Sequence, residues 1–388
     1  MKKLIYILNS YSETDASHFT HILHLLEIMA HKGCSVVLII EKAEGLPAFK
    51  NPNVRVVGLK SQKPFLRHVE LFRLIGGLIS DGYEASFVRI SAVTSIVASV
   101  AHHIHGGRSY LWQSGTTHEH DWAQPPSLKK FRWWIFSFVP NWLARRLTQY
   151  FVTGPEAMVD YYANVVGVPR SKIKLLYNDI QIERFQDVVV QEERRNFLAD
   201  RNIPEEITVL LLVHRLSPVR RTLMYLKPLL IRLKENSHES DWVLIIAGSG
   251  SELPEAKSIV AELGLGEKVI FLGNVPNKEI PRLYAVGDVF VHPTYTEGFP
   301  RVLIEAMAAG LPIVTTDAGG TAQLLGDKQR RFLVDKSQPE AFVEAAVDLI
   351  KSPECWLDLS RENKAVVERF STPAVASMYM NTIFGDAA

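Results

Sequence analysis

Short apolar runs rich in aliphatic and β-branched residues recur along the whole chain, separated by polar or glycine-containing segments. Runs that are apolar at successive positions are typical of parallel strands buried on both faces. They predict strands at residues 4–8, 35–40, 54–58, 85–88, 109–113, 149–153, 172–177, 209–214, 242–247, 268–272, 289–292, 313–316 and 331–334.

Helical patterns lie between most of these runs. Residues 19–32 place their apolar side chains on one stripe, and Gly33 follows as a candidate C-cap. Further helices are expected at 191–200 and 373–384. Alternating strands and helices predict an α/β fold with doubly wound parallel sheets.

The alternation restarts after a polar, irregular stretch at 178–206. We therefore expect two Rossmann-like domains, one over 1–190 and one over 191–370, with a last helix in 371–388. A length of 388 residues and an apolar fraction of 47% suit such a folded protein.

The charge and the cysteines narrow the function classes. Lys and Arg total 43 and Asp and Glu total 42, so the basic excess typical of nucleic-acid binding is missing and no nucleic-acid partner is expected. Cys34 and Cys355 are far apart and form no CxxC motif, which suggests neither a disulfide framework nor zinc.

The location is expected to be cytoplasmic. Two cysteines suit a reducing compartment. The apolar run 4–8 is too short for a signal peptide, and no stretch approaches the ~20 apolar residues of a membrane helix.

The segment 292–314 carries the most chemistry. It is expected to form a strand, a loop with Glu297, a helix that starts at Pro300 and contains Glu305, and a cap at Gly310. Two carboxylates so placed could hold two parts of an extended ligand, and the free amides at the helix start suit a phosphate. The alternative is that Glu297 caps the helix and Glu305 is solvated.

A basic loop follows the strand predicted at 209–214. It contains Arg215, Arg220 and Arg221, and it precedes a helix, where a diphosphate could sit. The alternative is a basic surface loop. Gly248 and Gly250 also follow a strand, where they would allow close approach to a ligand.

Together these segments resemble the retaining glycosyltransferases of the GT-B fold, specifically glycosyltransferase family 4. Glu297 and Glu305 match its E-x7-E motif, and residues 244–250, 269–273 and 317–320 are also similar. The resemblance is strong over about 207–330. Residues 214–221 align with the family pattern Gly-Arg-Leu-Ser-Pro-x-Lys-Gly, and Arg215 matches its Arg. Three positions differ: His214 replaces the first Gly, Arg220 the Lys and Arg221 the second Gly.

The resemblance implies an acceptor-binding domain over 1–190, a donor-binding domain over 191–370 and a last helix, 371–388, that returns to the first domain. It implies transfer of a hexosyl unit from a UDP- or GDP-sugar to an acceptor hydroxyl with retained anomeric configuration. No cofactor and no metal are expected. Cell-surface polysaccharide or glycolipid synthesis is the expected setting.

The resemblance also implies roles for individual residues. Glu297 and His118 would hold the donor sugar, and Arg215 and Arg220 the diphosphate. The remaining donor-binding candidates are Glu305 at the ribose, then Gly298, Phe299, Arg301, Val302, Gly248, Gly250, Gly273 and Arg221.

Two loops of the first domain depart from the family or leave choices open. The first loop, 9–18, lacks the glycines of relatives, and Ser12 and Asp15 are its candidate acceptor contacts. In the loop after residue 113, His120 is the runner-up to His118. The acidic and histidine residues of this loop could suggest a metal, but no matching ligand lies elsewhere, so we expect none.

The stretch 129–146 mixes bases with aromatics. It fits a helix that packs its aromatics into the core of the first domain. It also fits a helix that lies in a membrane interface, which would suit a lipid-linked acceptor.

Three rival classes share parts of these patterns. A nucleotide-sugar epimerase would need an acid/base pair that the sequence does not reveal. A phosphorylase would need a pyridoxal lysine and a longer chain. A non-catalytic subunit of a partner transferase would tolerate the glycines lost at His214, at Arg221 and in the first loop.

Overall fold

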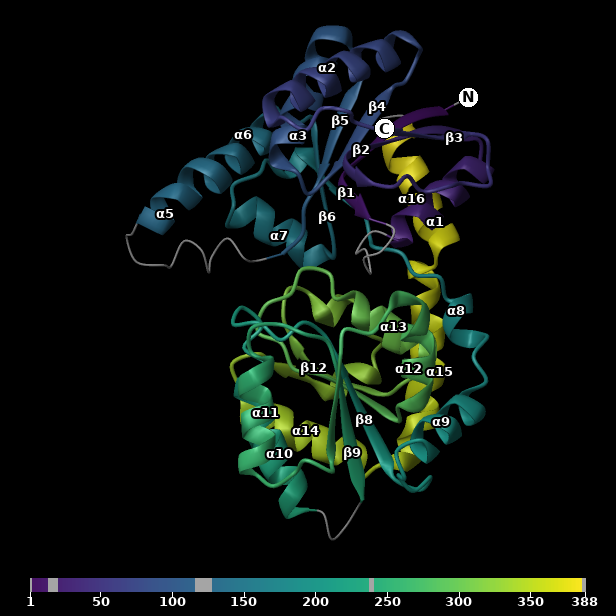
Figure 1. Ribbon diagram of the computed structural model, residues 1–388, viewed down its shortest axis with the longest axis vertical. Helices are drawn as coiled ribbons and strands as arrows, with labels where there is room; N and C mark the ends of the chain where they lie inside the picture. The colour runs from purple at the N-terminus through teal and green to yellow at the C-terminus, as the bar shows by residue number, and fades with distance from the viewer. Residues whose placement is uncertain (1, 13–19, 116–127, 237–240, 386–388) are drawn as a thin grey trace. The chain divides into compact units, whose positions relative to one another are not determined.

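The computed structural model describes residues 2–12, 20–115, 128–236 and 241–385, and it divides into two compact units (Figure 1). Unit 1 is formed by the described residues up to Asp179, except Gly115, together with those from Thr372 onward, and unit 2 by Gly115 and Ile180–Ser371. The expected domain boundary between residues 190 and 191 falls inside unit 2.

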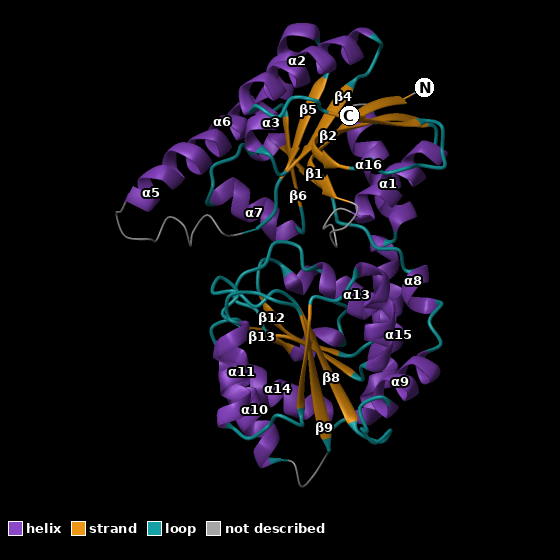
Figure 2. Cartoon of the chain, in the orientation of Figure 1, coloured by secondary structure: helices purple, strands orange, loops and turns teal. Residues whose placement is uncertain are grey.

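Unit 1 is built on a parallel sheet, whose strands are orange in Figure 2, with the strand order β3-β2-β1-β4-β5-β6-β7. Its strands are β1 (Lys2–Ser12), β2 (Cys34–Glu44), β3 (Val54–Gly58), β4 (Ala85–Arg89), β5 (Arg108–Trp112), β6 (Tyr150–Thr153) and β7 (Ile173–Leu175). Its helices are α1 (Thr20–His31), α2 (Pro64–Ser80), α3 (Ala92–His105), α5 (Leu128–Trp133), α6 (Val139–Leu147), α7 (Glu156–Asn164) and α16 (Thr372–Phe384).

The central strand β1 is buried on both faces because its side chains alternate between two helical layers. Leu4, Tyr6 and Leu8 pack in one core cluster with α1 and α16. Ile5 and Ile7 pack in another with α2 and α3. The last helix of the chain therefore completes one layer of unit 1.

Unit 2 repeats the plan with the strand order β10-β9-β8-β11-β12-β13. Its strands are β8 (Thr208–Val213), β9 (Trp242–Ala247), β10 (Val269–Gly273), β11 (Val289–His292), β12 (Ile313–Asp317) and β13 (Leu333–Asp335). Its helices are α8 (Glu183–Gln186), α9 (Val190–Ala199), α10 (Leu223–Glu235), α11 (Leu253–Glu262), α12 (Ile280–Val286), α13 (Arg301–Ala309), α14 (Pro339–Ile350) and α15 (Trp356–Val367).

The predicted α/β architecture is confirmed, and each predicted strand is present. The largest differences at a strand end are in β1 and β2, which continue to Ser12 and Glu44 because they keep pairing with each other beyond Leu8 and Ile40. Pro300 is the N-cap of α13 rather than its first residue, since its backbone is extended.

The basic aromatic stretch is one helical run, α5, the π-helix Trp134–Phe138 and α6. Its aromatics do not enter the core as the first of the two expectations had it: Phe131, Trp134, Phe136 and Trp142 are exposed. Only Ala144 is fully buried among the residues of the run whose side chains the structure describes. No helix in the described part of the chain is long and apolar enough to cross a bilayer.

Candidate functional site

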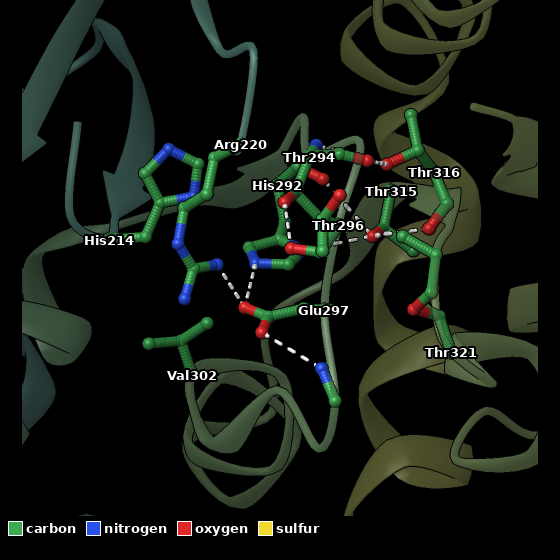
Figure 3. Close-up of polar contacts among 12 residues, drawn as sticks. His214, Arg220, His292, Thr294, Thr296, Glu297, Val302, Thr315, Thr316 and Thr321 are labelled. Atoms are coloured by element: carbon green, nitrogen blue, oxygen red, sulfur yellow. Dashed lines mark hydrogen bonds and ion pairs between the residues drawn. The ribbon is translucent and has the colours of Figure 1, made fainter. Parts of the chain in front are cut away.

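The candidate site lies where the strand order of unit 2 reverses. β8 and β11 are neighbours in the sheet, although β9 and β10 lie between them in sequence. In open α/β sheets, ligands bind beyond the carboxyl ends of the strands at such a point. The basic loop leaves β8 there, and the loop with Glu297 leaves β11. Figure 3 shows the side chains of Arg220 and Glu297 pointing toward one another.

The two predicted motifs meet in an ion pair. Arg220 Nη1 donates to Glu297 Oε1, and the Glu297 side chain is only 10% exposed. Glu297 Oε2 accepts from the Gly298 amide at 3.3 Å. The Tyr295 amide donates to the Arg220 carbonyl at 2.8 Å, so the two loops are also joined through their backbones.

Two buried histidines lie beside this pair. The rings of His214 and His292 pack edge to face with centroids 5.5 Å apart, and His292 Nε2 lies 3.9 Å from Glu297 Oε1. Burial, followed by the charge of Arg220, lowers the pKa of His292 to about 3. Burial, His292 and Arg220 also lower the pKa of His214 well below its ordinary value. Both rings are therefore neutral near pH 7.

Threonine hydroxyls fasten the loop after β11 to the end of β12. The Thr294 amide donates to Thr316 Oγ1 at 3.0 Å, and Thr315 Oγ1 donates to the His292 carbonyl at 3.1 Å (Figure 3). Thr294 Oγ1 donates to the Thr296 carbonyl at 3.1 Å. These bonds fix the backbone just before Glu297. Arg220 and the Gly298 amide hold the Glu297 carboxylate itself.

Helix α13 starts beside Glu297. The helix begins at Arg301, and the Leu303 amide donates to the Pro300 carbonyl at 3.0 Å. The first amides of a helix point out of its N-terminus, where they can donate to an anion. Gly310 caps the other end in the left-handed conformation, as predicted.

Glu305 lies one turn further along α13 and is partly buried. The Tyr284 hydroxyl is within hydrogen-bond distance of Glu305 Oε2, at 3.2 Å, and of the Val302 carbonyl, at 3.1 Å. Burial raises the pKa of the Glu305 carboxyl, and the nearby Arg301 partly offsets this. The interpretation of Glu305 as a fully solvated side chain is therefore wrong.

Arg221 stands where the resembled sequence pattern has its second glycine, and its backbone still adopts a conformation typical of glycine. Its φ is 50°, in the left-handed region that favours glycine. Its guanidinium lies 4.0 Å from the centre of the Tyr295 ring, a cation–π contact that offsets part of the backbone strain. Arg215, by contrast, is exposed.

The glycines after β9 allow a close approach of two backbone segments to each other rather than of the backbone to a ligand. A Cβ on Gly248 would collide with the His214 carbonyl, and one on Gly250 with the Leu216 carbonyl. The Gly248 amide donates to the Gly273 carbonyl at 2.7 Å. These contacts bring the loop after β9 against the basic loop.

Some predicted site residues lie elsewhere. Ser12 ends β1 in unit 1. His118, His120 and Asp15 lie outside the described residues. Within the described residues, no group of three histidine, cysteine or carboxylate side chains is arranged to hold a metal.

Sequence reasoning missed His292 and Tyr284. His292 is the last residue of the strand that leads into the loop with Glu297, and a polar residue at that position indicates a place at the site. Tyr284 comes from α12, and only the fold brings it to Glu305.

Comparison with known proteins bears on both units. The solved structure of Anabaena HepE in complex with UDP aligns with a TM-score of 0.72 at 18% identity, covering 98% of this chain and 99% of that one. Sucrose-phosphate synthase from Thermosynechococcus elongatus aligns with a TM-score of 0.75 at 17% identity, covering 98% of each chain. The chain has a GT-B fold.

The second unit of this GT-B protein also carries a family match. Residues 193–366 match the family described as glycosyl transferases group 1. An uncharacterized glycosyltransferase of Methanocaldococcus jannaschii is 27% identical over 232 residues, 59% of this chain and 58% of the relative. D-inositol 3-phosphate glycosyltransferase of Streptomyces avermitilis is 26% identical over 54% of this chain and 46% of the relative. The chain thus matches about half the length of these curated relatives.

Proposed function

We propose that this protein is a retaining, metal-independent hexosyltransferase of glycosyltransferase family 4. It moves a sugar from a UDP- or GDP-sugar to a hydroxyl of a saccharide or lipid-linked acceptor, in the cytoplasm, during cell-surface polysaccharide or glycolipid synthesis. The observation that carries the proposal is the meeting of Arg220 and Glu297 beside the start of α13, at the switch point of unit 2. The GT-B neighbour HepE, described in complex with UDP-glucose, supports a nucleotide-sugar donor.

The diphosphate of the donor would lie against Arg220 and the first amides of α13. Positive groups aimed at the departing diphosphate stabilise charge that develops in the transition state. Arg220 would then exchange its Glu297 partner for phosphate oxygens, and Arg215, exposed on the same loop, would add a second cation. Glu297, released from this pair, would accept hydrogen bonds from hydroxyls of the donor sugar.

The roles of the other residues follow from which part of the donor would lie beside each of them. Glu305 would accept from the ribose hydroxyls, and Tyr284, already bonded to it, would keep its carboxylate in place. His118 would orient the sugar. Retention would come from a same-face substitution in which the leaving phosphate takes the acceptor proton, since no side chain is assigned as a covalent nucleophile.

Donor binding and transfer by two matched variants test the proposal. Glu297→Gln breaks the Arg220 pair, and Asp288→Asn breaks a comparable partly buried pair in unit 2, Arg194–Asp288 at 2.9 Å. A panel of nucleotide sugars should raise the melting temperature of the native protein. We expect Glu297→Gln to lose about 10²–10³ in transfer rate. Asp288→Asn should lose stability but keep its activity per folded molecule.

Other outcomes point to the rival classes. If neither UDP nor GDP, free or in a sugar donor, raises the melting temperature, the protein is a non-catalytic subunit. If the donor sugar is converted to its epimer without an acceptor, it is an epimerase. NMR of the first-formed product gives the anomeric configuration, and unchanged rates in excess EDTA would bear out metal independence.

A further inference from the structure

The helical run 128–147, called the arm below, has a surface that the proposed transfer does not use. Figure 1 shows α5 at the far end of the arm, away from the sheet of unit 1, while α6 packs on α3. Phe131, Trp134 and Phe136 are exposed by 58%, 45% and 74%. Clustered exposed aromatics of this size mark an interaction site rather than ordinary surface.

The charge of the arm has one sign. Its twenty residues include two lysines and three arginines and no aspartate or glutamate. The arm thus combines exposed aromatic rings with a local charge of +5 in a chain whose total is +1. A second copy of the same arm would meet it with like charge, which opposes self-association.

A cation-lined cavity lies at the base of the arm. It has a volume of about 550 Å³, and its lining contains three cations and no carboxylate: Trp142, Arg145, Arg146, Val166, Gly167, Val168, Pro169 and Lys172. Lys172 Nζ donates to the carbonyls of Arg146 and Thr148, at 2.9 and 3.0 Å, and the Arg146 guanidinium lies 4.7 Å from the centre of the Trp142 ring. Backbone and aromatic groups therefore hold these two cations in place without neutralising them.

We propose that the arm docks unit 1 on an anionic lipid bilayer. The aromatic rings enter the boundary between headgroups and acyl chains, where tryptophan and other aromatics are favoured. The exposed Arg132 and Arg146 of the arm face the lipid phosphates, and the cavity receives one headgroup phosphate between Arg146 and Lys172. Each cation near an anionic surface strengthens binding by about fivefold, so several give a strong dependence on lipid charge.

The experiment is flotation of the full-length protein with vesicles. One set is phosphatidylcholine, and the other is phosphatidylcholine and phosphatidylglycerol in equal parts. Phe136→Ser is compared with Phe65→Ser, because Phe65 is the same residue type, is 77% exposed and lies on α2 of the same unit. We expect binding to anionic vesicles only, weakened by salt, about tenfold lower for Phe136→Ser and unchanged for Phe65→Ser.

A charge variant tests the cavity. Arg146→Gln together with Lys172→Gln should weaken binding to anionic vesicles by more than tenfold, with circular dichroism confirming the fold. Equal binding to both vesicle types, or equal losses from Phe136→Ser and Phe65→Ser, would overturn the proposal. The proposal would also be overturned if the protein were a dimer that Phe136→Ser dissociates. It would be overturned as well if a single-stranded oligonucleotide bound the protein as strongly as the anionic vesicles do. No assay here needs transferase activity, so failure leaves the proposed reaction standing.

Discussion

Gly319 offers a way to move Glu297 without touching it. Gly319 follows β12, its φ is +66°, and a Cβ added there would lie 2.7 Å from the Glu297 carbonyl carbon and closer still to the oxygen. Gly264 has nearly the same φ, +67°, but nothing lies within 4 Å of its added Cβ. Gly319→Ala and Gly264→Ala thus share the backbone strain and differ only in the collision.

The expected magnitudes follow from these numbers. Alanine in the left-handed region costs about 1–2 kcal/mol, and both variants should show this loss in the free energy of unfolding. Ordinary Cβ contacts begin at 3.4 Å, so the backbone at Glu297 must move by at least ~0.7 Å to clear its carbonyl carbon at 2.7 Å, and by more to clear the nearer carbonyl oxygen. The overpacking should cost Gly319→Ala a further 1–3 kcal/mol or so. A misplacement of about 1 Å can cost ~10²-fold in rate.

Urea denaturation and initial transfer rates, measured on both variants, test this reasoning. The free energy of unfolding at equal m-value gives the stability loss. Gly264→Ala should keep the wild-type rate, while Gly319→Ala should lose roughly tenfold to a hundredfold. If the two variants lose the same stability and keep the same rate, the position of Glu297 does not depend on its contact with Gly319, and the reasoning is refuted.

Three further predictions concern strain, protons and thiols. Arg221→Gly should be about 1 kcal/mol more stable than Arg221→Ala in thermal unfolding, because both lose the cation–π contact but only glycine relieves the left-handed backbone; equal stabilities would contradict the strain. The folded-state pKa values of His292 and His214 lie below the ordinary 6.5, so the unfolded chain binds protons that the folded one excludes. The free energy of unfolding should therefore fall as the pH drops below about 6.5, by about 1 kcal/mol per pH unit for each histidine. His292→Asn should reduce this slope, and an unchanged slope would show that burial does not keep the His292 ring neutral. Burial raises the pKa of the Cys34 thiol to about 12, so iodoacetamide should modify Cys355 first in the native protein, as mass spectrometry can check; early modification of Cys34 would contradict its burial.

The sequence was sufficient for the strands and for the two halves of the site. Buried parallel strands read as continuous apolar runs, so β8 and β11 are visible without a structure. Each motif could be placed at the carboxyl end of its strand. That Arg220 pairs with Glu297 follows from strand order, which no local pattern encodes.

The sequence was insufficient where two distant segments decide a side chain's surroundings. The missing glycine at His214 suggested a disturbed backbone, whereas its ring packs against His292, the last residue of β11, 78 positions away. The arm shows the same limit: its aromatic pattern fits a buried helix and an exposed one equally, and only the packing of α6 on α3 shows which residues stay outside.

The placement of α16 sets an order on how the chain can fold during synthesis. Apart from Gly115, the described residues of unit 2 lie between Ile180 and Ser371, so its sequence is complete before α16 leaves the ribosome. Unit 1 begins first but still lacks Val375, Tyr379 and Ile383, which are fully buried in its core. Until they arrive, the face of β1 that packs against α1 and α16 is covered by α1 alone. The part of the protein that is made first is therefore the part that finishes folding last.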